Sequence, residues 1–341
     1  MATSEAPASS TVSAATRGEG VFTDTLPGSR LTPMPSGGVL VWAGLGALWL
    51  AFIGIGGGWW VLHSSHFGPA PTGADQLSPL HLVFIRSFEI ASIAVTIWFI
   101  WAFLVVPVRA GQGLTRDGML VLGTTCAYFI DPLVNVFHYT FAYNAHELNL
   151  GSWDQVFPLH AGPPTHFAEG IAWALPQYVY FGAGGGLIAC WAFKRLQDRW
   201  PNITKVQCFA IYLAGFFVFD TILEYACVRF ELYTYAITWT PLTIDPGSQY
   251  QWPLYEGLIS GLYSAGIVYV RVCWAEGRQS FVDRGIERLT ISPPGKTAVL
   301  ALAVIGFCAA WAFLAWFAPW SWQSSGATSV ADIPSYMRPG P

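Results

Sequence analysis

Long apolar stretches recur along this chain almost from one end to the other. Hydrophobic residues make up 53% of the sequence and charged residues only 11%, whereas soluble domains carry about 25% charged residues. Backbone polar groups in lipid must be satisfied within their own segment, and alternating barrel strands are absent, so we predict an all-α, polytopic membrane protein. We expect about seven transmembrane helices, at residues 39–62, 81–108, 118–139, 166–193, 205–229, 253–275 and 296–318.

The basic residues indicate how the predicted helices are oriented. Most of the 16 Lys and Arg residues fall in the N-terminal segment and in the loops after the second, fourth and sixth predicted helices, all on one side of the membrane. The positive-inside rule makes this side cytoplasmic. Arg far outnumbers Lys, and Ala and Gly are abundant, as in high-GC bacterial genomes. We therefore expect a multi-pass protein of the bacterial plasma membrane with a cytoplasmic N-terminus.

Three regions are predicted along the chain. Residues 1–38 are rich in Ala, Ser, Thr, Pro and Gly and lack the apolar core of a signal peptide, so we expect a disordered cytoplasmic tail. Residues 39–318 would form the transmembrane catalytic domain, and residues 319–341 a C-terminal tail. The net charge of −4 argues against a nucleic-acid surface. The expected partners are the lipid bilayer and a small-molecule substrate, and the oligomeric state stays open.

Acidic residues occur inside the predicted helices, where a charged side chain is costly. An ionisable residue at that depth is a candidate functional group. Almost all of these residues lie toward the non-cytoplasmic ends of their helices, which predicts a wet, acidic chamber on that side. They are Glu89, Asp131, Glu169, Asp220, Glu224 and Glu256.

The third predicted helix carries a polar face. Asp131, Asn135 and His138 are spaced so that they share one side of an α-helix. We interpret this face as functional, because an Asp at lipid depth is otherwise unfavourable. The alternative is a structural polar network between helices.

The fifth predicted helix carries two carboxylates one turn apart, Asp220 and Glu224. Because like charges on one face repel, at least one of them should hold a proton near neutral pH. A protonated carboxyl is what a general acid needs. The alternative is that Arg86 or Arg229 neutralises the pair.

The other helices contribute further candidates. His166, Glu169 and Trp173 share a face of the fourth predicted helix, and Glu256 begins the sixth, where capping of the helix dipole is the alternative role. Arg86 is three residues from Glu89, and an internal ion pair is favoured over a substrate-anchoring Arg. The predicted substrate-binding residues are Asn135, His138, His166, Trp173, Gln177, Tyr178, Tyr225, Glu256, Arg86 and Glu89.

Two pairs of predicted helices look alike. Asp131 in the third helix matches Asp220 in the fifth, and Glu169-Gly170-Ile171 matches Glu256-Gly257-Leu258. Both copies have the same orientation, so the pattern would be a parallel repeat. Chance similarity between apolar segments explains it equally well.

The sequence indicates neither a metal site nor a cofactor. The six cysteines fall in predicted helices and form no CxxC pair, which argues against a disulfide framework and a zinc site. The seven histidines are too few and too scattered for a di-iron hydroxylase. A DDxxD motif and a GxSxG motif are both missing, which argues against a diphosphate-ionising terpene synthase and a serine hydrolase.

Roughly residues 40–318 resemble the AveC-like spirocyclase family of actinomycete polyketide pathways. The residues that carry the resemblance are Asp131-Pro132 with Asn135, Gly151-Ser152-Trp153, Glu169 with Pro176-Gln177-Tyr178, and Asp220 with Glu224.

The resemblance implies an enzyme that forms the spiroketal of avermectin-, milbemycin- or meilingmycin-type macrolides, so that the substrate is a polyketide macrolide. Some members also dehydrate the product. Spiroketal closure passes through an oxocarbenium ion and needs a proton donor and a proton acceptor, but no cofactor. On this interpretation Asp131 and either Asp220 or Glu224 form the acid/base pair, and Glu169 is a further catalytic candidate.

Two other functions fit the same residues. Another acid-catalysed membrane cyclase or isomerase, such as a terpene cyclase, would share the acidic chamber but not the substrate. A proton-coupled transporter would also need buried carboxylates. Conversion of a substrate in detergent solution, where there is no gradient, separates an enzyme from a transporter.

Overall fold

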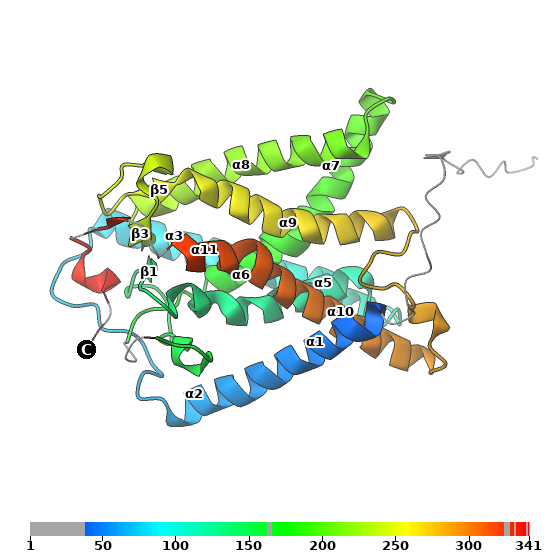
Figure 1. The fold of residues 1–341 in the computed structure, drawn as a ribbon, viewed down its shortest axis with the longest axis horizontal. Helices are drawn as coiled ribbons and strands as arrows, with labels where there is room; N and C mark the ends of the chain where they lie inside the picture. The colour runs from blue at the N-terminus through cyan, green and yellow to red at the C-terminus, as the bar shows by residue number, and fades with distance from the viewer. Residues whose placement is uncertain (1–37, 162–165, 324–327, 331, 339, 341) are drawn as a thin grey trace, which may run out of the picture. The chain divides into compact units, whose positions relative to one another are not determined.

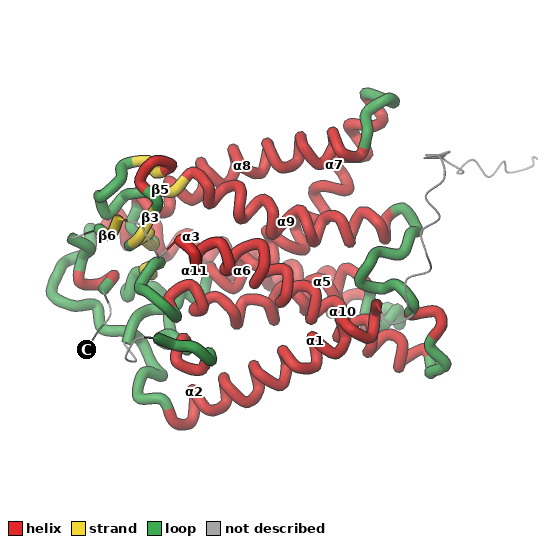
Figure 2. The backbone as a smooth tube through the Cα atoms, viewed as in Figure 1, coloured by secondary structure: helices red, strands yellow, loops and turns green. Residues whose placement is uncertain are grey.

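The computed structural model describes residues 38–161, 166–323, 328–330, 332–338 and 340 (Figure 1). The chain divides into two units, Met1–Pro35 and Ser36–Pro341, and all the described residues belong to the second. The disordered tail predicted over residues 1–38 lies outside the described residues, except that Gly38 begins the first helix. The described residues are mostly helical with a few short strands (Figure 2), which confirms a mainly α-helical chain.

Five helices among the described residues are long and apolar enough to cross a membrane. They are α1–α2 (Gly38–Phe52 and Gly58–His63), α3–α4 (Pro79–Ile100 and Val106–Arg109), α8 (Lys205–Arg229), α9 (Leu254–Ala275) and α10–α11 (Pro293–Ala312 and Ala318–Gln323). The joins inside them are π-helical turns at Ile53–Gly57, Trp101–Val105 and Phe313–Phe317.

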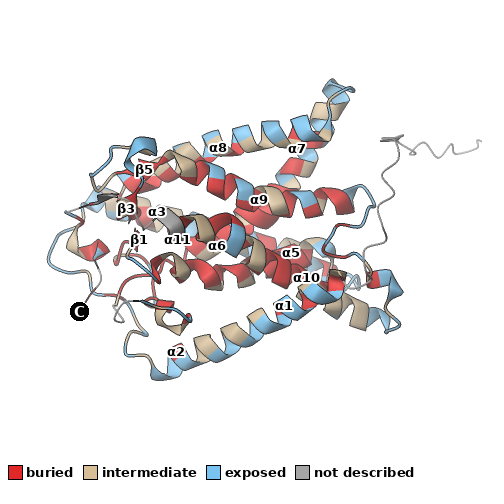
Figure 3. Cartoon of the chain, in the orientation of Figure 1, coloured by how far each residue is buried: buried red, intermediate tan, exposed pale blue. Residues whose placement is uncertain are grey.

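Burial separates these helices into two groups. The most apolar windows of α9 and α10–α11 are 61% and 56% buried, whereas those of the other three are 17% buried (Figure 3). Large apolar side chains such as Leu62, Ile90 and Ile222 are exposed on the outer three. Continuous apolar surface of this kind is typical of a membrane or protein contact. α9 and α10 therefore form the interior, and α1–α2, α3–α4 and α8 have apolar outer faces.

The segment predicted as a transmembrane helix at 118–139 is not one α-helix. It forms α5 (Arg116–Ala127) followed by a 3-10 helix (Tyr128–Asn135). Pro132 explains the change, because it has no N–H for an α-helical bond and disfavours the α conformation at Asp131. Asp131 therefore lies on a tighter turn than the sequence pattern implied.

The segment predicted at 166–193 starts as a helix only at α6 (Ala174–Val179), which runs through a π turn (Tyr180–Gly184) into α7 (Gly185–Arg199). The residues before α6 instead pair with loops, since Gly170 forms an isolated β-bridge with Asn149. The described part of the chain thus has five candidate membrane helices, where the sequence predicted about seven.

Three short antiparallel ribbons gather at one end of the helices (Figure 2). They pair β1 (Phe141–Tyr143) with β2 (Tyr233–Tyr235), β3 (Ile237–Thr238) with β6 (Thr328–Ser329), and β4 (Thr243–Ile244) with β5 (Trp252–Pro253). In the first ribbon, Tyr143 lies opposite Tyr233 and Phe141 opposite Tyr235. This pairing brings aromatic residues from two distant loops together above the helices.

The opposite ends of the helices carry basic residues. Arg271 of α9 forms an ion pair of 2.5 Å with Asp117 of α5. Lys205, at the start of α8, forms one of 2.8 Å with Glu276, which follows α9. Basic residues that the sequence assigned to the cytoplasmic side therefore lie at the helix ends far from the ribbons (Figure 1).

The C-terminal residues return to the end where the ribbons lie. The hydroxyl of Tyr139 donates to the Met337 carbonyl at 2.8 Å, and the hydroxyl of Tyr336 donates to Glu231 at 2.7 Å. These bonds fix residues 332–338 against loops that follow the third and fifth predicted helices.

The structure gives no support to the parallel repeat suggested by the sequence. Asp131 lies on a 3-10 turn, whereas Asp220 lies in the uninterrupted helix α8. Glu169 precedes α6 in non-helical backbone, whereas Glu256 lies in the first turn of α9. The segments that look alike in sequence therefore have different local structures.

Candidate active site

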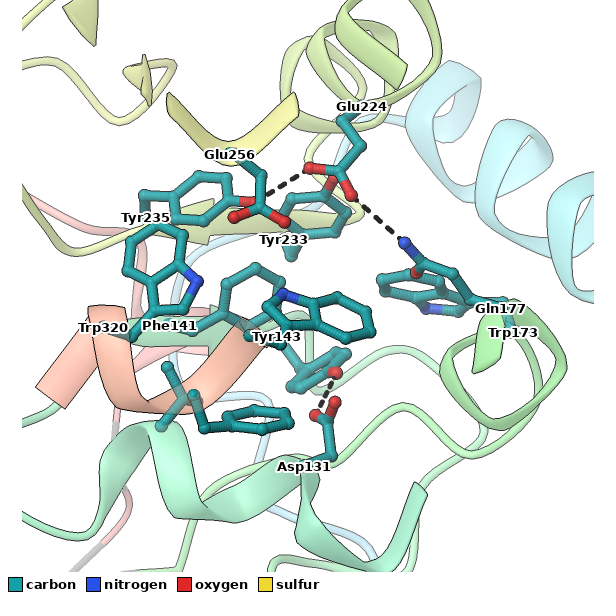
Figure 4. A pocket seen from close by; sticks show the side chains of 13 residues that line it. Asp131, Phe141, Tyr143, Trp173, Gln177, Glu224, Tyr233, Tyr235, Glu256 and Trp320 are labelled. Carbon is teal, nitrogen blue, oxygen red and sulfur yellow. Dashed lines mark hydrogen bonds between the residues drawn. The ribbon is translucent and has the colours of Figure 1, made fainter. Parts of the chain in front are cut away.

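A buried cavity lies between the 3-10 helix, α6, α8, α9 and the first ribbon (Figure 4). Its volume is about 40 Å³, which is room for only a few water molecules. Asp131 lies on one side of the cavity, and Glu224 and Glu256 lie on the other. The remaining lining residues are Val134, Phe141, Tyr143, Trp173, Gln177, Tyr233, Tyr235, Trp316, Phe317 and Trp320.

Two tyrosine hydroxyls hold Asp131. Tyr143 of β1 donates to Oδ2 at 2.5 Å, and Tyr178 of α6 donates to Oδ1 at 2.7 Å. Both donors are buried, so neither bond competes with bulk water. Hydrogen bonds to a carboxylate favour its charged form. The two tyrosines therefore hold both carboxyl oxygens of Asp131 in place at the edge of the cavity.

Glu169 lies behind Asp131 and interacts with it electrostatically. Glu169 is fully buried, and the hydroxyl of Tyr128 is 3.4 Å from its Oε1 atom. Two neighbouring carboxyls in a dry site cannot both be ionised without a large cost. Asp131 and Glu169 are therefore arranged as a carboxyl pair that can hold one proton between its two members.

Glu224, on the opposite wall, is held by three donors. Its Oε1 atom accepts from Gln177 at 3.1 Å, and its Oε2 atom accepts from Tyr235 at 2.8 Å and from Trp252 at 3.4 Å. These donors come from α6, β2 and β5, so the side chain is fixed by three separate parts of the chain.

Two more carboxyls adjoin Glu224. Glu256 of α9 accepts from the hydroxyl of Ser260 at 2.7 Å. Asp220, one turn before Glu224 on α8, is fully buried. One oxygen from each of Asp220, Glu224 and Glu256 can be chosen so that all three lie within 4.8 Å of one another. This wall therefore concentrates three acidic groups.

Several predicted site residues do meet at this cavity. Trp173 and Gln177 line the cavity, and Tyr178 donates to Asp131; Gln177 and Tyr178 lie on α6, and Trp173 immediately precedes it. Asp131, Glu169, Asp220, Glu224 and Glu256 also gather here, Asp220 and Glu169 lying just behind the lining residues.

Other predicted site residues lie elsewhere. Asn135 shapes the turn before β1, since its side chain bonds the backbone of Thr140 and Phe141. His138 is exposed. Tyr225 bonds Asp245 in an outer loop at 2.9 Å, and His166 contacts the Gly68 carbonyl at 2.9 Å.

Arg86 and Glu89 form the ion pair that the sequence favoured. Arg86 also donates to the carbonyl of His146 at 2.6 Å, and the N–H of Leu148 donates to Glu89 at 2.6 Å. Both residues therefore bond the loop that contains His146 and Leu148. Arg86 holds this loop in place and does not line the cavity.

The aromatic residues that hold the carboxyls were not predicted from the sequence. Tyr143 and Tyr235, which donate to Asp131 and Glu224, lie outside the predicted helices, where aromatic residues are expected as interfacial belts. The period-two pattern of Tyr233-Thr234-Tyr235 is a weak strand signal that could have placed two of them on one face. Their partner strand is about 90 residues away in sequence, so no local pattern pointed to it.

Glu147 was also missed. It is buried, and its Oε2 atom accepts from the indole of Trp173 at 2.8 Å. Burial raises the pKa of Glu147 well above its usual range, and the hydrogen bond from Trp173 opposes that rise only in part. Glu147 therefore adds a buried carboxyl directly behind the wall that Trp173 forms.

Comparison with known protein families agrees with this geometry. A family model described as "Spirocyclase AveC-like" matches residues 112–336, more than half of the chain. The matched region includes Asp131, Glu169, Asp220, Glu224 and Glu256. Comparisons with curated proteins and with solved structures gave no match. The extent of the family match confirms the resemblance seen in the sequence, and the chain belongs to the AveC-like spirocyclase family.

Proposed function

We propose that this chain is a membrane-embedded enzyme that closes a dihydroxy-ketone polyketide to a spiroketal with loss of one water. The observation that carries the proposal is that Asp131 faces Glu224 and Glu256 across a buried, aromatic cavity (Figure 4). Family membership supports the reaction class. The substrate class, a macrolide precursor, follows from the family's known products.

The Asp131–Glu169 pair carries the proton transfers in this proposal. One substrate hydroxyl adds to the ketone carbon and passes its proton to the pair, while the proton that the pair already holds goes to the ketone oxygen, which gives a cyclic hemiketal. The pair then protonates the hemiketal hydroxyl, which leaves as water. The second hydroxyl attacks the resulting oxocarbenium ion and returns a proton to the pair. A carboxyl pair that shares one proton suits both directions of transfer.

The cavity walls suit the cationic intermediate. Faces of Trp and Tyr rings attract a nearby cation, and Trp173, Tyr233, Trp316 and Trp320 line the cavity. Glycosidases place carboxylates around an oxocarbenium-like transition state for the same electrostatic reason. Once the substrate is bound, the surrounding rings also limit which face of the planar ion the second hydroxyl can reach, which supports a single spiro epimer.

An apolar groove beside the cavity is suited to bind a hydrophobic substrate. The groove encloses about 610 Å³ between α1, the 3-10 helix and α10–α11. Ile130 and Leu133 line it, and they flank Asp131 in sequence. Since the cavity holds only about 40 Å³, we propose that the groove takes the apolar part of the polyketide while aromatic side chains move to admit the reacting atoms.

We also propose that the protein spans the bacterial plasma membrane with its N-terminus inside and the cavity toward the outside. The basic residues at the far ends of the helices support this orientation. Alkaline phosphatase fused to the C-terminus should be active in cells, and green fluorescent protein fused there by the Sec route should stay dark. The opposite result would reverse the orientation.

The deciding experiment is turnover by the detergent-purified chain. Protein in chelator-free buffer is incubated with a dihydroxy-ketone macrolide precursor, and the products are followed by mass spectrometry and chiral chromatography. The proposal requires loss of one water and one spiroketal epimer. Loss of a second water would add dehydratase activity.

Variants connect the activity to the cavity. Asp131→Asn and Glu224→Gln should each reduce product formation at least about tenfold, the scale of a lost proton transfer or a lost charged hydrogen bond. Asp198→Asn is the matched control, because Asp198 is exposed and paired with Lys194 on α7. Unchanged precursor, or the epimer mixture of the buffer blank, from folded wild-type protein would favour another cyclase or a transporter.

A further inference from the structure

The carboxyls of Asp220, Glu224 and Glu256 form a buried cluster without a basic partner. Their relative exposures are 0%, 4% and 1%. In the part of the chain that the structure describes, none of the ion pairs involves any of the three. Three such groups so close together need either protons or a bound cation.

Hydrogen-bond donors reach some of the carboxyl oxygens in this cluster but not others. Donors occupy both oxygens of Glu224 and the Oε1 atom of Glu256. Among the described residues, Oε2 of Glu256 and both oxygens of Asp220 have no hydrogen-bond partner, although they are buried. Asp220 is thus a fully buried side chain close to two other carboxyls, with no hydrogen-bond partner among the described residues.

Protons alone do not account for this arrangement. A protonated Asp220 would present a hydroxyl that needs an acceptor, and an unpaired buried polar group costs about 1–3 kcal/mol. The described residues offer Asp220 no hydrogen bond in either role. A divalent cation between the three groups would instead engage Asp220 and Glu256 together and reduce the local negative charge.

We propose that Asp220, Glu224 and Glu256 bind one hard divalent cation, of the Mg²⁺, Mn²⁺ or Ca²⁺ class, on the cavity wall opposite Asp131. An all-oxygen ligand set selects such ions over zinc or copper, which take nitrogen and sulfur ligands. Oxygens bound at about 2.1–2.6 Å lie at most about 4–5 Å apart across the ion, which matches the 4.8 Å limit of the cluster.

The surroundings are those of a supported metal site. Metal-binding side chains are usually oriented by further hydrogen bonds, and here Gln177, Tyr235 and Ser260 supply them. Three protein ligands leave coordination positions open toward the cavity, which Glu224 and Glu256 line. The inference departs from the sequence-based expectation that the chain holds no metal.

This site deepens the proposed function and rests on it for its chemical role. The cation would coordinate the substrate's ketone oxygen and draw electron density from the carbon as the first hydroxyl attacks. The proton of that hydroxyl still goes to the Asp131–Glu169 pair, and the proton that the pair already holds goes to the ketone oxygen. In the next step the departing oxygen takes a proton from the pair and leaves as water that the ion can hold. The ion changes no oxidation state.

Binding of Mn²⁺ tests the site without any turnover. The detergent-purified full chain is stripped with EDTA, desalted and titrated with Mn²⁺, and free Mn²⁺ is followed by electron paramagnetic resonance. The expected result is one saturable Mn²⁺ per chain, displaced by excess Mg²⁺ or Ca²⁺. Asp220→Asn and Glu256→Gln should each weaken binding at least about tenfold, whereas Asp131→Asn, on the opposite wall, should bind Mn²⁺ as the wild type does.

Two results would overturn the site. One is the absence of saturable Mn²⁺ binding up to millimolar concentrations by wild-type protein that elutes as a single species in size exclusion. The other is unchanged binding in both ligand variants. Failure of the cyclase itself would look different: Mn²⁺ would bind and the precursor would stay unconverted. Full turnover by metal-free protein would support the proposed cyclase activity and would show that the reaction does not use the cation.

Discussion

The hydroxyl of Tyr178 donates a 2.7 Å hydrogen bond to Oδ1 of Asp131. Tyr178 lies on α6 and Asp131 on the 3-10 helix, 47 residues earlier in the chain. The bond therefore connects Asp131, a member of the proposed proton-transfer pair, to α6. The same helix carries Gln177, which donates to Glu224. One short helix thus positions carboxyls on both sides of the cavity.

Removing this hydroxyl should slow the reaction more than it weakens binding. A hydrogen bond to a charged group contributes about 1.5–3 kcal/mol, so Tyr178→Phe should lower kcat by at least about tenfold while KM changes less. Steady-state kinetics on the precursor measure both constants. Tyr212→Phe is the control, because Tyr212 bonds Ser264 at 2.6 Å away from the cavity lining. Equal kcat values in the two variants would contradict a role for Tyr178 in orienting Asp131.

Filling the apolar groove should weaken substrate binding. Ala310 lines the groove beside α1, so the side chain in Ala310→Trp would occupy part of it. Displacing a few methylene groups of bound substrate costs ~1.4 kcal/mol, which corresponds to a KM about tenfold higher with little change in kcat.

The matched control is Ala192→Trp, which fills a second apolar groove, between α7 and α8. A rise in KM confined to Ala310→Trp would support substrate binding in the groove beside α1. The same KM for both variants would remove the groove from the proposal.

Glu147 should make the folded protein less stable as the pH rises. Burial raises its pKa well above the usual range, whereas in the unfolded chain it ionises near about 4.3. Between these values the folded protein holds one more proton than the unfolded chain, so stability falls as the pH increases. The melting temperature of Glu147→Gln should therefore exceed that of the wild type at pH 8 and equal it near pH 4. If the melting temperatures of the variant and the wild type differed by the same amount at pH 4 and at pH 8, the predicted effect of Glu147 on stability would be wrong.

Glu231 should have the opposite effect. Burial alone would raise its pKa, but hydrogen bonds from Tyr336, His81 and Tyr250 outweigh it, so the pKa of Glu231 is lowered. Stability from its charged form is present above the unfolded pKa and is lost as the pH falls through the folded pKa.

Glu231→Gln should consequently destabilise the protein at pH 7 by about 1–3 kcal/mol. The difference from the wild type should shrink toward pH 4. Thermal unfolding at both pH values measures this, and a destabilisation that persists unchanged at pH 4 would mean that Glu231 acts through packing instead.

The apolar pattern of the sequence was a good guide to where helices lie and a poorer guide to how long they are. Five of the predicted spans correspond to helices that can cross a membrane. The two that failed contain Pro132 and the residues before α6, where backbone bonds go to loops such as the one at Asn149. Hydropathy averages over such interruptions, because it does not record where each N–H finds its partner.

The acidic residues of the site could also be found from the sequence. Asp131, Glu169, Glu224 and Glu256 are conspicuous, since a carboxylate in an apolar stretch is unfavourable without a function. His138 and His166 were predicted from their helical spacing to Asp131 and Glu169, and Tyr225 was also a substrate-binding candidate, yet all three lie outside the cavity. Spacing on one helix cannot tell which of its faces meets the other helices.

Composition and local spacing were enough to predict the helical, apolar character of this protein and its buried acidic residues, and its motifs carried the family resemblance. That Asp131 and Glu224 face each other, held by tyrosines of β1 and β2, became visible only in the folded chain. The pairing of β1 with β2, which brings the two walls of the cavity together, joins segments about 90 residues apart, and contacts over such separations arise from packing and pairing that no local pattern encodes.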